Sequence, residues 1–162
     1  VKAEIDRVKD VDGASQFVYV KDIHKVYGGI VHAVRGISFA AAEGQVFGLL
    51  GVNGAGKTTT FKMLCGQEAP TSGEVRIQGI DVSLKAGEAR KHIGYCPQFN
   101  ALLDSLTTVE HLYLFGRLKG LSGQQLKTAV NSALTDLDLH SFVNSRAGQL
   151  SGGNKRKVNV GM

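Results

Sequence analysis

A glycine-rich stretch constrains this chain more than any other feature of its sequence. Residues 51–60 read GVNGAGKTTT and match the phosphate-binding pattern G-x-x-x-x-G-K-[ST] at every fixed position. Glycines let successive backbone N–H groups turn into one concavity, which attracts anions. Lys57 is then placed to reach the β- and γ-phosphates, and the Thr58 hydroxyl to bind Mg²⁺. The stretch predicts a site for a nucleoside triphosphate.

The flanking sequence supplies the context that such a loop requires. Residues 45–50 (QVFGLL) are a short apolar run, typical of a strand buried on both faces. Residues 59–65 have helical spacing, and Gly66 stands where a helix would end. The apolar residues of this predicted helix are Phe61, Leu64 and Cys65. Strand, loop and helix therefore follow one another in the order that phosphate binding needs.

Composition limits the classes of protein to consider. The chain has 162 residues, of which 43% are hydrophobic, as expected for a globular domain with a core. No apolar run approaches the roughly 20 residues that span a bilayer. The net charge of +5 is too small and too scattered to indicate a nucleic-acid partner. Cys65 and Cys96 lack a second pair of metal ligands, so we expect reduced, packed thiols in a cytosolic protein. Because the chain starts at Val1 without a leader, we expect a piece of a longer protein.

Before and after the glycine-rich loop, the pattern indicates mainly strands. Residues 1–16 are polar and predict a linker or a frayed start. A short polar helix is expected over residues 83–92. The predicted strands cover residues 17–23, 32–39, 74–79 and 93–96.

Two side chains at the ends of predicted strands are candidates for contacting a nucleotide. Tyr27 precedes the flexible pair Gly28-Gly29, and it either packs on its own sheet or stacks on an adenine ring. Such stacking contributes about 1–3 kcal/mol per base in nucleic-acid binders. Gln98 follows a strand that Pro97 stops, and ligands of open α/β sheets lie beyond the carboxyl ends of strands. Gln98 is therefore expected to face the nucleotide, with an ordinary loop residue as the alternative.

From Leu102 onward the pattern changes from strands to helices. Thr107 and Glu110 have the spacing of a capping box, and so have Ser122 and Gln125. The first helix is expected to end at Gly120 and to turn Leu112, Phe115 and Leu118 inward. The second has Leu126, Val130, Ala133 or Leu134, and Leu137 on one face.

A second candidate anion site follows these helices. Ser151 is expected to cap a helix, and Gly152 and Gly153 to expose its first N–H groups. The alternative is a serine-capped helix that binds nothing. The basic run at residues 155–157 predicts a solvated helix face, with contact to phosphate or lipid headgroups as the alternative.

Together these motifs resemble those of an ATP-binding cassette (ABC) ATPase. Residues 51–58 resemble the Walker A loop, Gln98 the Q-loop glutamine and residues 150–153 the signature motif, in that family's order and spacing. Tyr27 occupies the place of the family's adenine-stacking aromatic. The wording of residues 47–64, 93–102 and 150–157 is similar to nucleotide-binding domains of the A subfamily, which are large eukaryotic membrane proteins and mostly move lipids.

The resemblance implies an α/β fold of the P-loop NTPase (RecA-like) type. It would have an N-terminal antiparallel β part and an inserted α-helical subdomain, and it would be truncated at its C-terminus. The implied domains are a linker at 1–16, the N-terminal part of the catalytic core at 17–101, the helical subdomain at 102–150, and the signature motif with the start of its helix at 151–162.

The resemblance also implies ligands, partners and a location. The cofactors would be ATP and Mg²⁺, with Thr58 and Gln98 at the metal. The implied ATP-binding residues are Tyr27, Gly51, Asn53, Gly54, Ala55, Gly56, Lys57, Thr58, Thr59, Gln98, Ser151, Gly152 and Gly153. The last three would touch ATP held by a second cassette across a pseudo-two-fold interface. The parent's transmembrane domains would be further partners, nucleic acid would not, and the domain would lie at the cytoplasmic face of a membrane as part of an integral membrane protein.

The family's hydrolytic residues do not occur in this segment. An apolar strand ending Asp-Glu (the Walker B strand), and then a switch His, would follow beyond Met162. Phosphoryl transfer depends on positioning, and the Glu positions the attacking water. We therefore expect the parent protein to be a transport-coupled ATPase, and the isolated segment to fold poorly and to lack turnover.

Other nucleotide-binding classes share part of this pattern. A soluble ABC ATPase acting on DNA or ribosomes has the same motifs, but the coiled-coil insertions usual there are absent from these residues. A degenerate cassette that binds ATP without hydrolysis also fits. A GTPase would need Asn-Lys-x-Asp, whereas Asn154-Lys155 continues into Arg156-Lys157.

Overall fold

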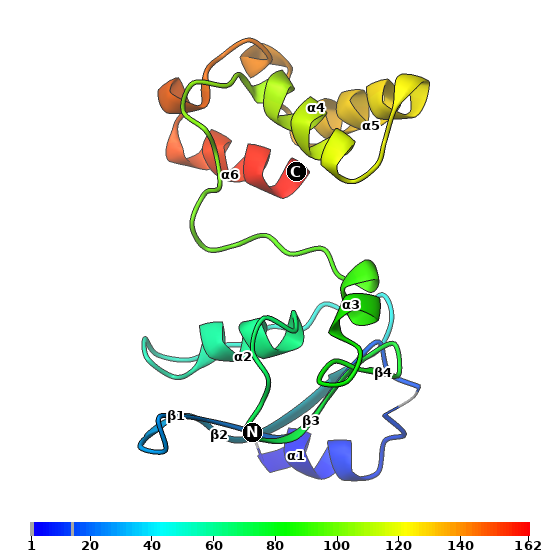
Figure 1. Ribbon diagram of the computed structural model, residues 1–162, viewed down its shortest axis with the longest axis vertical. Helices are drawn as coiled ribbons and strands as arrows, with labels where there is room; N and C mark the ends of the chain where they lie inside the picture. Colours follow the sequence, from blue (N-terminus) through cyan, green and yellow to red (C-terminus); the bar gives the residue numbers. More distant parts are fainter. Residues whose placement is uncertain (1, 14) are drawn as a thin grey trace. The chain divides into compact units, whose positions relative to one another are not determined.

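The computed structural model describes residues 2–13 and 15–162. Within this part the chain divides into two compact units, one up to Tyr95 and the other from Cys96 to Met162. The first unit contains the sheet and the second is helical (Figure 1).

The sheet of the first unit is antiparallel and has the strand order β2-β1-β3-β4. Its strands are β1 (Val18–Tyr27), β2 (Val31–Ala41), β3 (Ser72–Ile77) and β4 (Ile80–Asp81). Strands β1, β2 and β3 confirm three of the predicted strands, within a few residues at their ends. Gly28 and Gly29 have φ values of +57° and +72°, so the turn between β1 and β2 uses backbone that only glycine adopts easily.

Helix α2 (Lys57–Leu64) covers this sheet and completes the main core of the first unit (Figure 1). Met63 and Thr60 are its buried residues, whereas Phe61 is 44% exposed, contrary to the predicted apolar face. The predicted helix at 83–92 is shorter, with α3 (Ala86–Ala89) followed by a 3₁₀ turn (Arg90–His92). The core consists of Val20, Ile23, Val34, Phe39, Met63, Val75, Ile77, Val82 and Ala89.

Two predicted strands are wrong. Residues 45–50 and 93–96 have no strand conformation, and Val46 and Leu50 are 97% and 92% exposed although we expected a doubly buried strand. An apolar run becomes a strand only when neighbouring strands bind its N–H and C=O groups. Among the described residues, none of the four strands pairs with either segment.

The N-terminal residues also differ from the expected linker or frayed start. Residues Lys2–Lys9 form helix α1, which packs against β2. Val8 is 1% exposed and lies in a small core with Tyr19 and Ala40. One buried apolar residue was too weak a signal to predict this helix from a polar sequence.

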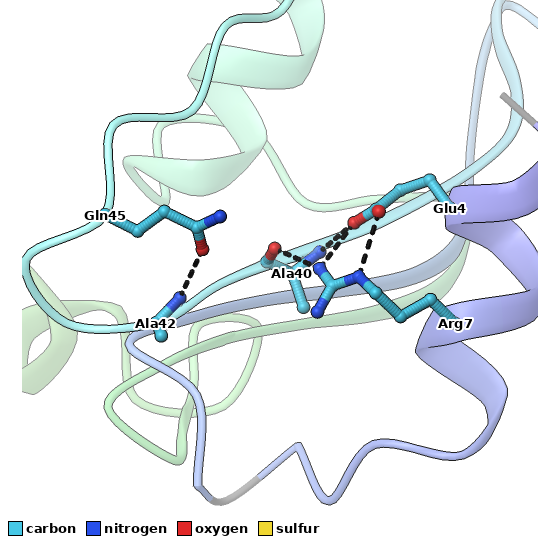
Figure 2. Close-up of polar contacts among 5 residues, drawn as sticks. All are labelled: Glu4, Arg7, Ala40, Ala42 and Gln45. Atoms are coloured by element: carbon cyan, nitrogen blue, oxygen red, sulfur yellow. Dashed lines mark hydrogen bonds and ion pairs between the residues drawn. The ribbon is translucent and has the colours of Figure 1, made fainter.

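Polar side chains from α1 cover the end of β2, as Figure 2 shows. The Ala40 N–H donates to Glu4 Oε1 at 3.1 Å, and Arg7 Nη2 donates to the Ala40 carbonyl at 2.5 Å. Two residues on, the Ala42 N–H donates to Gln45 Oε1 at 3.1 Å. Since β2 is an edge strand, these side chains satisfy backbone groups that a neighbouring strand would otherwise bind. Arg7 also holds the pKa of the Glu4 carboxyl below its usual range through its hydrogen bond.

The second unit is built from helices α4 (Thr108–Leu118), α5 (Gly123–Asp136) and α6 (Gly152–Gly161), with 3₁₀ turns at His140–Phe142 and Ala147–Gln149. The predicted face of α5 is confirmed, because Leu126, Val130 and Leu134 are buried. On α4, Leu112 is buried but Leu118 is 71% exposed. The core comprises Leu112, Leu126, Val130, Leu134, Leu139, Leu150 and Val158.

A buried histidine, which was not singled out from the sequence, lies on α4 next to Leu112. His111 is fully buried, and its Nε2 accepts a hydrogen bond from the Leu103 N–H at 2.9 Å. Its Nδ1 donates to the Thr107 carbonyl at 2.9 Å. These two bonds fix a neutral imidazole with the proton on Nδ1, because Nε2 must be free to accept. His111 therefore anchors the segment that leads into α4.

Helix α4 begins with the predicted capping box, whereas α5 does not. Thr107 Oγ1 accepts from the Glu110 N–H at 3.3 Å, and Glu110 Oε2 accepts from the Thr107 N–H at 2.7 Å. Ser122 is the N-cap of α5 but makes no side-chain capping bond. The second predicted capping box is therefore wrong.

This difference predicts unequal effects of two alanine substitutions. Thr107→Ala should lower the free energy of unfolding by about 1 kcal/mol, because it removes the acceptor of the Glu110 N–H at the start of α4. Ser122→Ala is the matched control and should cost much less, since no capping bond is lost. Thermal unfolding of the purified protein measures both, and equal losses would contradict the assignment.

Candidate nucleotide-binding site

The glycine-rich loop lies between residues 45–50, which form neither helix nor strand, and helix α2. Gly54 and Gly56 have φ values of +82° and +85°, so the loop turns through backbone conformations that favour glycine. At Gly56, a Cβ atom would lie 2.3 Å from the Ala33 carbonyl oxygen of β2. The close approach of loop and strand therefore requires glycine at this position.

The Lys57 side chain bonds back to the start of the loop. Its Nζ donates to the carbonyls of Gly51 at 2.6 Å and Val52 at 2.8 Å. An ammonium group has three N–H donors, so these bonds leave one for a further acceptor. The positive charge is thus held beside the exposed loop residues 51–55.

The first turn of α2 adds backbone donors to this charge. Gly56 is the N-cap and gives no side-chain bond, so the N–H groups of the first turn keep their capacity to bind an anion. Thr60 Oγ1 is turned inward and donates to the Gly56 carbonyl at 3.0 Å. Thr58, by contrast, is exposed. Loop, lysine and helix start together form a cradle suited to phosphate oxygens.

Tyr27 stands at the end of β1 in the same unit and is 38% exposed. Its hydroxyl donates to Glu68 Oε2, and Lys25 Nζ lies over its ring, 5.2 Å from the centroid. The bond to Glu68 raises the pKa of the Tyr27 hydroxyl, while the hydroxyl of Thr59 acts in the opposite direction. Tyr27 therefore reaches the first turn of α2 and remains a protonated phenol at neutral pH.

The remaining candidate residues belong to the second unit. Gln98 is exposed and follows Pro97, whose carbonyl accepts a hydrogen bond from Arg156 Nη1 of α6. Asn159, also on α6, accepts from the Ala101 N–H at 3.3 Å. Sequence reasoning missed both contacts, because each joins positions more than fifty residues apart. They fix the segment around Gln98 to helix α6.

Helix α6 begins as expected, with Ser151 as its N-cap. Ser151 Oγ accepts from the Asn154 N–H at 3.3 Å, and Gly152 and Gly153 are exposed on the first turn. The basic residues that follow have acidic or carbonyl partners within the unit. Lys155 Nζ lies 3.8 Å from Asp104 Oδ1, and Lys157 Nζ lies 3.7 Å from Asp138 Oδ2.

The structure thus divides the sequence-predicted residues between its two units. Tyr27 and residues 51–59 lie in the first, and Gln98 and residues 151–153 in the second. Among the described residues, no group of three His, Cys, Asp or Glu side chains could hold a metal ion. Both cysteines are free thiols, and burial raises the pKa of Cys65.

The phosphate cradle and the elements around it define a class of protein, the P-loop nucleoside triphosphatases. Comparison with known proteins identifies the family within this class. Residues 34–162 match the model of the ABC transporter family, so the chain belongs to this family.

The similar curated proteins are members of subfamily A. The human phospholipid-transporting ATPase ABCA3 is 46% identical over 145 residues, which cover 88% of this chain and 8% of ABCA3. The bovine retinal-specific phospholipid-transporting ATPase ABCA4 is 40% identical over 99% of this chain and 7% of its own length. The human ATP-binding cassette sub-family A member 2 is 42% identical with the same coverage. The chain therefore spans less than a tenth of each of these relatives.

Solved structures agree on the fold. The ATP-binding subunit of an ABC transporter superposes with a TM-score of 0.75 at 29% identity, over 90% of this chain and 60% of that chain. The cbiO1 protein of Clostridium perfringens, part of the transporter complex cbiONQ, superposes with a TM-score of 0.80 at 23% identity, over 91% of this chain and 60% of that one. These likenesses confirm the predicted P-loop NTPase fold class. No helix in the described part of the chain is long and apolar enough to cross a membrane.

Proposed function

We propose that this chain is the nucleotide-binding part of a membrane transporter in which binding and hydrolysis of ATP drive the movement of phospholipid. The observation that carries the proposal is the phosphate cradle formed by the glycine loop, Lys57 and the uncapped start of α2. The relatives named phospholipid-transporting ATPases support the choice of lipid as substrate.

Within the first unit, each candidate residue has a distinct role toward ATP. The backbone of Gly51 and Asn53–Gly56 surrounds the phosphates, and Lys57 with Thr59 completes the cradle. Thr58 would hold Mg²⁺, which neutralises charge on the phosphate oxygens when bound. Tyr27 stacks on the adenine. The residue types fit this ligand, because backbone N–H groups, an ammonium and a hydroxyl are what a magnesium-bound polyphosphate requires.

The second unit serves a different nucleotide. Ser151, Gly152 and Gly153 offer the start of α6 to the γ-phosphate of ATP held by a second cassette. Two such cassettes form a pseudo-two-fold sandwich, whose closure on ATP and reopening move the transmembrane domains of the parent protein. In this arrangement the chain lies at the cytoplasmic face of the membrane.

We propose ATP turnover for the parent protein and expect none from these 162 residues alone. Hydrolysis needs a carboxylate that orients the attacking water, and after the signature motif these residues contain no Asp-Glu pair that could supply it. Turnover therefore belongs to the parent protein.

Reconstitution of the parent protein in liposomes tests the proposal. With Mg²⁺ and ATP present, a fluorescent phospholipid should change leaflets, whereas ADP should support no movement. ATP binding without hydrolysis would instead indicate a non-hydrolysing cassette. Hydrolysis by a parent protein that does not partition into membranes would indicate a soluble ABC ATPase.

A further inference from the structure

Four side chains, one of them Tyr27, form a polar cluster that we call the Glu68 cluster. It consists of Lys25, Tyr27, Lys62 and Glu68. Glu68 Oε2 accepts from the Tyr27 hydroxyl, and Glu68 Oε1 accepts from Lys62 Nζ at 3.1 Å. Lys25 Nζ lies 3.7 Å from Glu68 Oε2. Glu68 is thus the centre of the cluster, and nothing in its local sequence pattern pointed to it.

Glu68 is placed by the turn that ends helix α2. Gly66, with φ at +62°, turns the chain back so that the N–H groups of Gln67 and Glu68 donate to the Lys62 carbonyl at 2.9 and 3.3 Å. The same turn therefore brings the Glu68 carboxylate beside the Lys62 side chain.

The segment after Glu68 is fastened along β1. Lys25 Nζ donates to the Ala69 carbonyl at 2.6 Å, and the Val26 N–H donates to Thr71 Oγ1 at 3.0 Å. The Thr71 N–H donates to the His24 carbonyl at 2.8 Å. Bonds on both sides of Glu68 hold its backbone in place, so its carboxylate is a fixed acceptor.

Charge favours the bond between Glu68 and Tyr27. The Glu68 side chain is 22% exposed and faces the ammonium groups of Lys25 and Lys62. The hydrogen bonds from Tyr27 and Lys62 hold the pKa of Glu68 below its usual range. Glu68 is therefore a carboxylate at neutral pH, and a phenol donating to a carboxylate makes a charge-assisted hydrogen bond, roughly twice as strong as a neutral one.

We propose that Glu68 is a positioning residue that fixes the Tyr27 ring for stacking on the nucleotide base. The inference rests on the proposed function, in which Tyr27 stacks on adenine. Strand β1 holds one end of the tyrosine and Glu68 holds its hydroxyl, so the ring is ordered before the base arrives. Ordering the side chain in advance removes an entropic cost from binding. The effect concerns affinity for the base and leaves the phosphates untouched.

The test measures ATP hydrolysis by the reconstituted parent protein carrying variants of the cluster. Glu68→Ala should raise KM for ATP about 3- to 10-fold and change kcat less than about twofold, because the Tyr27 side chain is then no longer held in place before the base binds. Glu68→Gln keeps an acceptor and should restore part of the affinity. Tyr27→Phe removes only the hydroxyl and should match Glu68→Ala, and the double variant should be no worse than either. Glu88→Gln, at an exposed glutamate of α3 paired only with Lys85 at 3.6 Å in the described contacts, is the control and should change nothing.

The base dependence separates positioning from a general structural role. UTP stacks more weakly than ATP, so Glu68→Ala should reduce the preference for ATP over UTP, whereas a folding defect would lower kcat with both nucleotides. An unchanged KM in Glu68→Ala and Tyr27→Phe, beside a raised KM in Tyr27→Ala, overturns the role of Glu68 and leaves the proposed function intact. An unchanged KM in Tyr27→Ala as well removes the stacking role of Tyr27, and with it this inference. If Glu68→Ala does not fold, Tyr27→Phe makes the same comparison.

Discussion

Replacing Lys57 with alanine should abolish ATP-dependent transport by the parent protein. In the structure, Lys57 Nζ bonds the carbonyls of Gly51 and Val52 and keeps its charge inside the loop. The substitution removes the only side-chain cation of residues 51–60, where charge must be neutralised during phosphoryl transfer. We expect kcat/KM for ATP to fall on the order of 100-fold or more, as measured by phosphate release in liposomes.

The control is Lys91→Ala, which removes an exposed lysine of the same unit outside the loop. This variant should retain full activity. That result would show that removing one positive charge from the unit is not enough to abolish turnover. Unchanged turnover in Lys57→Ala would show that the loop is not the site of hydrolysis. A parallel loss in both variants would point to an effect on the protein's net charge.

Gly56→Ala should destabilise the first unit more than any other substitution considered in the loop. A φ of +85° costs an alanine roughly 1–2 kcal/mol, and its Cβ would lie 2.3 Å from the Ala33 carbonyl oxygen. Because that oxygen belongs to strand β2, it has little freedom to move. We expect a loss of about 2–4 kcal/mol in the free energy of unfolding, seen as a lower Tm.

Gly54→Ala is the matched control for this prediction. Gly54 has nearly the same φ, +82°, but no atom lies within 4 Å of a Cβ built there. It should therefore show the conformational cost alone, about 1–2 kcal/mol. Equal losses in the two variants would mean that the contact between loop and β2 relaxes freely.

Much of the local geometry of the candidate nucleotide site was predictable because its parts are close together in the sequence. The glycines of the loop, the start of α2 and the cap of α6 at Ser151 depend on residues within a few positions of one another. The same holds for the capping box at Thr107. At Ser122 the residue types were right but the side-chain bond did not form, since a pattern specifies a bond only when the backbone presents both groups.

The contacts that position these parts were beyond prediction from a single sequence. Glu68 reaches Tyr27 across 41 positions, and Arg156 reaches Pro97 across 59. His111 was hidden for another reason, since a histidine on an apolar face looks like an interruption until its two hydrogen bonds are seen. Helix α1 likewise depends on its contacts with β2, which a single sequence does not reveal.

The sequence by itself determined the phosphate-binding loop, the order of the motifs and the membership in the ABC family. Backbone geometry at glycines and helix starts is local, so a pattern of neighbouring residues is enough to specify it. Only the tertiary structure decided which apolar runs became strands, because pairing depends on partners elsewhere in the chain. For this reason residues 17–23 fall largely within a paired strand, β1, as predicted, whereas the apolar run at residues 45–50 formed no strand and is largely exposed.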